Sequence, residues 1–454
     1  MNVLVMCSAI VGTRMASPGI RSSNIARVLK QQLPDAKVTL ALPPKLPSDL
    51  DPASVEFNVE WPDQRRMIEL IREHDVIVTA KFPLKYMPFA LNKKIVLDLY
   101  TPFYTEWMEM SKNDPSAKHR RAWLESKRKN LLAQMAAADL ILCANDRQRD
   151  LLIGIMGTLG YVTARAYDDD PTLERLVRVA PLGIRPNEPQ PGAPIMKGVM
   201  PGIAESDFVL LFNGTIVEWY DLDLLVHAVH RLSRERSDIK LVFMGTEHPD
   251  SFGAKPLQGL GGGATKHAMA LAEQLGILGT HIFFNFGWAN ADETERYLQE
   301  ADASVCTYWD SLETRYSFRV RYLDVFWARL PIICTRGDVV SEWVDEYPLG
   351  VAIPEGDLDG LADAIRRLAD DREFRERCRA NLGELREQFR WERTLAPLVE
   401  FCRTDSAVLT RRREQVLPLV THSLDWLVSQ SYYNARWTVV NPLMNRLGLN
   451  RGKH

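Results

Sequence analysis

Cysteine pairs, metal-ligand spacings and long apolar runs are all missing from this 454-residue sequence. Its six cysteines form no CxxC pair and no Cys/His metal spacing. Most of them lie in or beside apolar, strand-like stretches, so we expect buried thiols in a reducing cytoplasm. No window approaches the ~20 consecutive apolar residues that span a membrane. The opening stretch MNVLVMCSAIVG lacks a basic leader, and we interpret it as a first strand rather than a signal peptide.

A strong excess of charge is missing too. Lys and Arg number 56 and Asp and Glu number 59, which gives a formal net charge of −3. This balance excludes a general nucleic-acid binder. The apolar fraction of 46% and the charged fraction of 25% are ordinary for a globular protein, so disorder is excluded as the main state.

Two motifs of nucleotide and metal chemistry are also absent. No stretch has a GxGxxG loop with an acid about 20 residues further on, which disfavours a dinucleotide-dependent dehydrogenase. No Asp-x-Asp pair lies in a suitable loop, since the DDD at 168–170 falls in a polar stretch. We therefore expect chemistry without a metal ion and without a cofactor.

What is present is alternation of strand-like and helix-like segments in two successive runs. Such alternation predicts an α/β fold with parallel sheets and helices on their faces. The proline-rich stretch 180–202 separates the runs, so we place domains at 1–185 and 186–385, with helices over 386–454. The expected strands are 2–10, 37–42, 75–80, 94–99, 139–144, 207–214, 240–245, 281–287, 301–308, 331–335 and 349–354.

The most informative window is 301–338. A strand ends near Tyr308, a polar loop follows, and a helix is expected to begin near Phe318. The start of a helix favours anions, and Arg319 and Arg321 add full charges beside it. Asp324, further along this helix, is placed to accept ribose hydroxyls. The alternative is a charged surface loop in which Asp324 pairs with Arg321 or another neighbour.

The same window resembles the donor-binding element of GT-B glycosyltransferases, in the retaining group called family four. The stretch ETRYSFRVRYLD, followed by WARLPIICTRGD, is closest to a bacterial subgroup with an SFRxRxLD signature. Three other stretches resemble further elements of that fold: PGIRSSNIARVL its glycine loop and first helix, APLGI the strand end before its second domain, and NGTIVEWYDLDLLVHAV the loop that opens its nucleotide domain. The resemblance implies two Rossmann-like domains facing across a cleft, and sugar transfer from a nucleoside-diphosphate sugar with retention. It also implies a cytoplasmic bacterial enzyme of cell-envelope polysaccharide synthesis.

The sequence departs from the family pattern at two points. Gly214 is followed by Thr215 where the family has an Arg, and the family's lysine position falls at Tyr220. The family's first acid would fall on Tyr316, three residues after Glu313. The cations for the donor diphosphate must therefore come from elsewhere. The residues assigned to donor binding are Gly19, Gly214, Thr215, Trp288, Thr314, Ser317, Phe318, Arg319, Arg321 and Asp324, and those assigned to catalysis are Glu313, Arg319 and Asp98.

The resemblance assigns the acceptor to the first domain. There Asp98 ends a strand and is the expected contact for an acceptor hydroxyl, with a structural cap as the alternative; Glu106 follows eight residues later. The basic stretch 118–130 suits a glycan or lipid-linked acceptor that carries phosphate, or is simply a solvated face. Two other functions stay open: a nucleotide-sugar epimerase or hydrolase, and a catalytically silent sugar-nucleotide binder.

The tail, 403–454, has eight Lys and Arg against three Asp and Glu. Its apolar residues recur at helical spacing, for example from Leu417 to Leu427 and from Trp437 to Leu447. One interpretation is a pair of helices strapped across the domains. The other is a peripheral contact with an anionic membrane at the inner face, or with a partner.

Overall fold

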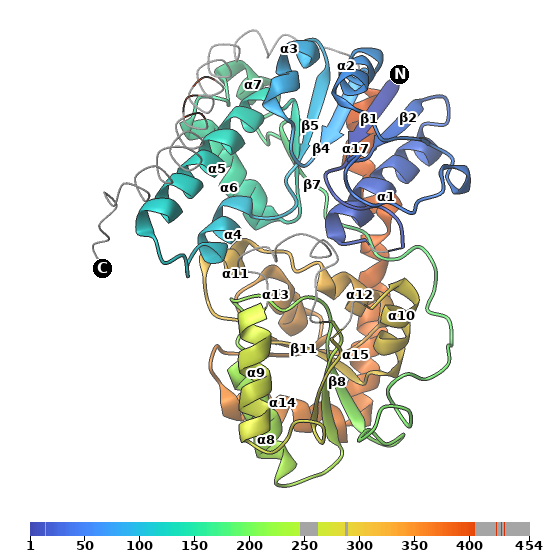
Figure 1. Cartoon of the computed structure of the whole chain (residues 1–454), viewed down its shortest axis with the longest axis vertical. Coiled ribbons are helices and arrows are strands. Elements are labelled where there is room, and N and C mark those ends of the chain that lie inside the picture. The colour runs from blue at the N-terminus through green and yellow to red at the C-terminus, as the bar shows by residue number, and fades with distance from the viewer. Residues whose placement is uncertain are drawn as a thin grey trace, which may run out of the picture.

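The computed structural model describes residues 1–13, 15–245, 262–286 and 289–404, together with Leu424, Val428 and Ser431. Two separate parallel sheets with helices on their faces lie one above the other, so the predicted α/β fold with two Rossmann-like domains is confirmed (Figure 1). The central strands are almost fully buried because strand–helix–strand connections cover both faces of a parallel sheet. Of the predicted tail helices, only Leu424, Val428 and Ser431 belong to the described residues.

The first sheet has the strand order β3-β2-β1-β4-β5-β6-β7. The order reverses between β1 and β4, and ligands of open parallel sheets bind at the carboxyl edge beside such a point. Its strands are β1 Asn2–Met6, β2 Lys37–Ala41, β3 Asn58–Glu60, β4 Val76–Thr79, β5 Lys94–Asp98, β6 Leu140–Cys143 and β7 Val177–Val179. Its helices are α1 Ser17–Gln32, α2 Gln64–Glu73, α3 Met87–Ala90, α4 Phe103–Met110, α5 Ala117–Ala137, α6 Asp146–Thr158 and α7 Ala164–Asp169.

The second sheet has the order β10-β9-β8-β11-β12-β13, with its reversal between β8 and β11. Its strands are β8 Phe208–Phe212, β9 Ile239–Phe243, β10 Ile282–Phe284, β11 Ala303–Cys306, β12 Ile332–Thr335 and β13 Gly350–Ile353. Its helices are α8 Leu222–Ser233, α9 Gly262–Gln274, α10 Ala291–Glu300, α11 Leu312–Tyr316, α12 Arg321–Ala328, α13 Val339–Glu346, α14 Leu358–Asp370 and α15 Arg372–Leu385.

The chain then returns from the second domain to the first through α16 Trp391–Thr394 and α17 Ala396–Arg403 (Figure 1). Arg403 donates to the carbonyl of Gln32 at the end of α1, and Glu400 pairs with Arg178 of β7 at 2.7 Å. Trp391 lies so close to Gly183 that a Cβ there would stand 2.5 Å from the indole ring. A side chain at Gly183 would therefore push the returning helices away from the first domain. None of the helices in the described ranges is long and apolar enough to cross a membrane.

The window after β11 differs locally from the sequence-based expectation. Residues 312–316 form the short helix α11 instead of a loop, because the Ser311 hydroxyl caps it by accepting from the Thr314 N–H. The next helix, α12, begins at Arg321 and not near Phe318. Its early N–H groups on Tyr322 and Leu323 already donate to carbonyls one turn back. The helix start therefore offers fewer free donors to an anion than expected.

Candidate functional site

Arg319 lies buried between two carboxylates. Its Nη2 is 3.2 Å from Glu313 Oε2 and 3.1 Å from Thr314 Oγ1, and its Nε is 3.4 Å from Asp338 Oδ2. The guanidinium also lies over the Tyr308 ring, at 4.2 Å from the centroid. Arg319 is only 4% exposed, and burial raises the pKa of Asp338. Arg319 is therefore a buried residue that holds Glu313 and Thr314 in place.

Arg321 has a different environment, although it is only two residues away. From the first position of α12 it reaches the loop after β8, where its Nη2 donates to the Thr215 carbonyl at 2.7 Å and to the Tyr220 hydroxyl at 2.9 Å. Its guanidinium lies over the Phe212 and Tyr220 rings, at 4.6 and 4.5 Å from their centroids. Its other terminal nitrogen, Nη1, is buried and has no hydrogen-bond partner within the described residues.

The loop under Arg321 is shaped by Gly214. This residue has a φ of +96°, a conformation that a side chain would strain. The preceding Asn213 fixes the loop to α12, because its Nδ2 donates to the Arg321 carbonyl at 3.0 Å. Gly214, Thr215 and Arg321 therefore form one cationic cradle at the carboxyl end of β8. Arg321 extends from α12 to Tyr220, the residue at the position where the family has a lysine.

Asp324 pairs with a residue that the sequence did not single out. Arg185, in the segment between the two sheets, donates through Nε to Asp324 Oδ1 at 3.0 Å. Arg185 also donates to the Ala291 carbonyl and lies over the Trp327 ring. Asp324 keeps about a third of its side chain exposed, and Arg185 engages one of its two oxygens. Nothing in the spacing of Arg185 and Asp324, 139 residues apart, predicts this pair.

The remaining residues assigned to donor binding are buried wherever the structure describes them. Thr314 and Ser317 are buried, and Thr314 Oγ1 donates to the Trp309 carbonyl at 2.8 Å. Phe318 is 3% exposed and packs against Trp343 and Phe389. In the first domain, a Cβ on Gly19 would stand 2.1 Å from the Ile10 carbonyl oxygen, so the backbone there requires glycine. Trp288 lies outside the described residues.

Asp98, the residue assigned to the acceptor, is part of a buried ion pair. Both of its oxygens accept from Arg21, at 2.9 and 2.7 Å. Arg21 also donates to the carbonyls of Ala180 and Pro181, just before the second domain. Asp98 is 2% exposed. This geometry gives Asp98 a structural role, tying β5, α1 and the exit from β7, and its contact with an acceptor stays a prediction.

A different acid of the first domain faces the second. Glu106 lies on α4, which packs against α11, the helix that carries Glu313. Burial and, second, the negative charge of Glu313 raise the pKa of Glu106 to about 7. The two domains also touch nearby, because Gln148 of α6 donates to the Tyr316 carbonyl at 2.8 Å and Arg147 to the Gly337 carbonyl at 2.7 Å. In the sequence, the signal for Glu106 is its position soon after the end of β5.

Comparison with known proteins finds one family model and several solved structures that resemble the chain. Residues 200–383 match the family model described as glycosyl transferases group 1. Sucrose-phosphate synthase from Thermosynechococcus elongatus is similar in structure, with a TM-score of 0.57 and 13% identity over 88% of this chain and 98% of that one. Anabaena HepE in complex with UDP-glucose gives 0.55 and 13%, over 93% and 100%.

WaaG, a glycosyltransferase involved in lipopolysaccharide biosynthesis, has a TM-score of 0.55 and 16% identity, over 88% of this chain and 98% of its own. No curated protein matches the chain in sequence. The cradle at β8 lies inside the matched residues, and the shared structure covers both domains. The chain therefore has the GT-B fold, and its residues 200–383 carry a group 1 glycosyltransferase domain.

Proposed function

We propose that the chain transfers a sugar from a nucleoside-diphosphate sugar to an acceptor held by the first domain, with retention and without a metal ion. The observation that carries this proposal is Arg321 on the Gly214 loop, a cation at the edge of the sheet with no carboxylate within ion-pair distance among the described residues. A planar guanidinium suits the oxygens of a diphosphate, and a glycine lets the backbone approach them closely. The complex of Anabaena HepE with UDP-glucose supports this choice of donor.

The donor would lie across α12 and the β8 loop. Its diphosphate would contact Arg321 and the loop at Gly214, and Asp324 would accept from the ribose with the oxygen that Arg185 leaves available. Arg319 would act indirectly, by holding Glu313 toward the donor sugar. Preorganised charges of this kind stabilise the negative charge that develops on a leaving group.

The reaction exchanges one bond for another at the same carbon. The bond between the sugar's anomeric carbon and the diphosphate oxygen breaks, and its electron pair stays on the diphosphate, where Arg321 stabilises it. The acceptor oxygen forms its bond to the same face of that carbon. Its proton passes to an oxygen of the leaving diphosphate, so no other reactant is needed. Because Arg321 supplies the positive charge, activity should survive EDTA, and a strict requirement for Mg²⁺ or Mn²⁺ would contradict this scheme.

The cellular role rests on two likenesses. The SFRxRxLD stretch resembles a bacterial subgroup, and WaaG acts in lipopolysaccharide biosynthesis. We propose that the chain works in the cytoplasm on cell-envelope polysaccharide.

Calorimetric titration with UDP and with GDP tests the donor site. We expect one of them to bind the full chain, and Arg321→Gln to weaken that binding at least tenfold. Arg315→Gln is the matched control, because Arg315 is an exposed arginine of the neighbouring helix α11 and should leave the affinity unchanged. Equal affinities of the two variants would remove Arg321 from the site. Turnover of the sugar nucleotide without any acceptor would favour the epimerase or hydrolase.

A further inference from the structure

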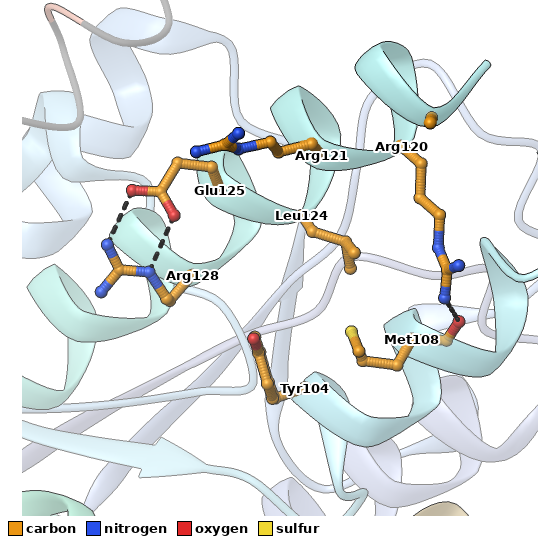
Figure 2. Close-up of a pocket in the computed structure, with 8 residues that line it drawn as sticks. Tyr104, Met108, Arg120, Arg121, Leu124, Glu125 and Arg128 are labelled. Carbon is orange, nitrogen blue, oxygen red and sulfur yellow. Dashed lines mark hydrogen bonds and ion pairs between the residues drawn. The ribbon is translucent and has the colours of Figure 1, made fainter.

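A pocket of about 390 Å³ opens between α4 and α5 of the first domain (Figure 2). This volume is within the range of pockets that bind small molecules. Nothing in the donor chemistry uses it, because none of the residues assigned to the donor lines it. Its lining residues are Tyr104, Met108, Ala117, Arg120, Arg121, Leu124, Glu125 and Arg128.

One side of the pocket is apolar. Tyr104 and Met108 are four residues apart, on one face of α4, and they point toward Leu124 of α5 (Figure 2). Tyr104 is 41% exposed and Met108 38% exposed, which is high for such large side chains. Single exposed apolar residues are ordinary, but a group of them lining one hollow indicates a surface for an apolar ligand.

The other side of the pocket is cationic. Ala117, Arg121, Leu124 and Arg128 follow one another at helical spacing and form one stripe of α5. Arg128 forks onto Glu125, with bonds of 2.9 and 2.7 Å (Figure 2). Arg121 is exposed and forms no ion pair or hydrogen bond within the described part of the chain. Three guanidinium groups against one carboxylate leave the lining with a net positive charge.

The pocket is close to the place where the acceptor must react. Glu106 is two residues after Tyr104, so it projects from the opposite side of α4, where α11 packs. The pocket and the interdomain side are thus separated by one helix, a thickness of about 10–12 Å. A molecule bound in the pocket can extend past α4, so that its other end lies near Glu313.

We propose that the α4–α5 pocket binds a phosphate ester that bears an apolar chain, and that this ester is the carrier of the sugar acceptor. The phosphate lies against Arg121, and the first carbons of the chain lie on Tyr104, Met108 and Leu124, whereas Arg120 is engaged by the Ser111 hydroxyl and the Met108 carbonyl. The carrier role rests on the proposed function, whereas the binding site does not. A free sugar would need side chains that match its hydroxyl groups, and Glu125 is the only carboxylate or amide among the lining residues.

Calorimetric titration of the full chain with dodecyl phosphate, below its micelle concentration, tests the site. We expect dodecyl phosphate to bind at least tenfold more tightly than inorganic phosphate, which lacks the chain, or dodecyl maltoside, which lacks the anion. Arg121→Glu should weaken it at least tenfold, and so should Met108→Ser. Lys118→Glu is the matched control, because Lys118 is exposed on the same helix but does not line the pocket.

Each result either supports the proposed phosphate-ester site or contradicts it. Equal affinity for dodecyl phosphate and inorganic phosphate would reduce the pocket to a plain anion site and overturn the proposal. Equal affinity of Arg121→Glu and wild type would do the same, provided that the thermal midpoint shows both folded; if Arg121→Glu unfolds, Arg121→Gln replaces it. UDP or GDP binding by Arg121→Glu should stay unchanged, so a failed donor site and a failed pocket give different results.

Vesicles separate a ligand in the pocket from general attraction to a membrane. With phosphatidylglycerol vesicles, we expect Arg121→Glu to reduce binding at least fivefold more than Lys118→Glu, because only Arg121 lines the pocket. If both variants lose the same amount, the charge of α5 acts as a diffuse surface and the proposal is wrong. Phosphatidylcholine vesicles, which lack net charge, should bind neither variant nor the wild type.

Discussion

An arginine lies near the carboxyl edge of the sheet in each domain, and the two have opposite surroundings. Arg21 of the first domain is fully engaged: two bonds to the Asp98 carboxylate and two to backbone carbonyls. Arg321 of the second domain donates to a carbonyl and a hydroxyl and lies over two rings. The first charge is neutralised inside the protein, whereas the second has no carboxylate partner among the described residues, as the proposed donor site requires. An arginine at a sheet edge therefore indicates an anion site only when its counter-ion is missing.

Breaking the buried pair should give the largest effect. Arg21→Met leaves the Asp98 carboxylate buried without its partner, and we expect unfolding in urea to lose about 3–5 kcal/mol. Arg321→Met removes two hydrogen bonds to neutral acceptors and should lose only about 1–2 kcal/mol. The double variant Arg21→Met/Asp98→Leu should recover most of the loss, since no isolated charge remains. Equal losses from the two single variants would remove the contrast.

The second largest effect concerns Glu106, the acid of the first domain that faces the second. The pKa of Glu106 is raised to about 7 by burial and by Glu313, against an ordinary value near 4.5. Between these two values the unfolded chain has released a proton that the folded chain keeps, so stability falls as pH rises. The fall amounts to at most roughly 3 kcal/mol from pH 4.5 to 7. Urea unfolding of Glu106→Gln should lack this component, and wild type and variant with the same pH profile would contradict it.

A third prediction tests whether nucleotide binding depends on the carboxylate of Asp324. Asp324→Ala should weaken UDP or GDP binding by on the order of 2 kcal/mol, by removing the acceptor for the ribose hydroxyls, and should leave the thermal midpoint nearly unchanged. Arg185→Ala is its counterpart, because it frees the oxygen of Asp324 that Arg185 now engages. We expect it to preserve or strengthen nucleotide binding. Loss of affinity in Arg185→Ala but not in Asp324→Ala would assign the contact to Arg185.

The order of elements could be predicted because strand and helix signals are local. Apolar bursts such as 207–214 and 331–335 become β8 and β12, and their burial follows from the parallel sheet. The short helix α11 could not be predicted, because the Ser311 cap decides it through one hydrogen bond. Departures at Thr215 and Tyr220 indicated that a cation must come from elsewhere, yet not which one.

The two arginines of SFRVR show where such reasoning stops. Arg319 and Arg321 have the same chemistry and nearly the same position in the chain. Only the packing of α11 and α13 brings Glu313 and Asp338 onto Arg319 and leaves Arg321 for the β8 loop. The long-range pairs Arg185–Asp324 and Arg21–Asp98 are likewise set by tertiary structure. Residue types could be chosen from the sequence, but the counter-ion of each charge required the fold.

The smallest effect should come from a third arginine, whose carboxylate partner is exposed. Arg147 of the first domain pairs with Glu342 of α13, and the Glu342 side chain is 62% exposed. Arg147 also donates to the carbonyls of Arg315 and Gly337, so its place between the domains does not depend on the carboxylate. Glu342→Gln should therefore lower the free energy of unfolding in urea by less than about 1 kcal/mol. Added salt should change the stability difference between wild type and this variant by no more than that amount. Arg147→Ala, which loses the backbone contacts as well, should cost more. If Glu342→Gln instead cost as much as Arg21→Met, the charge pair itself, and not its burial, would decide the loss, and the contrast between Arg21 and Arg321 would need another cause.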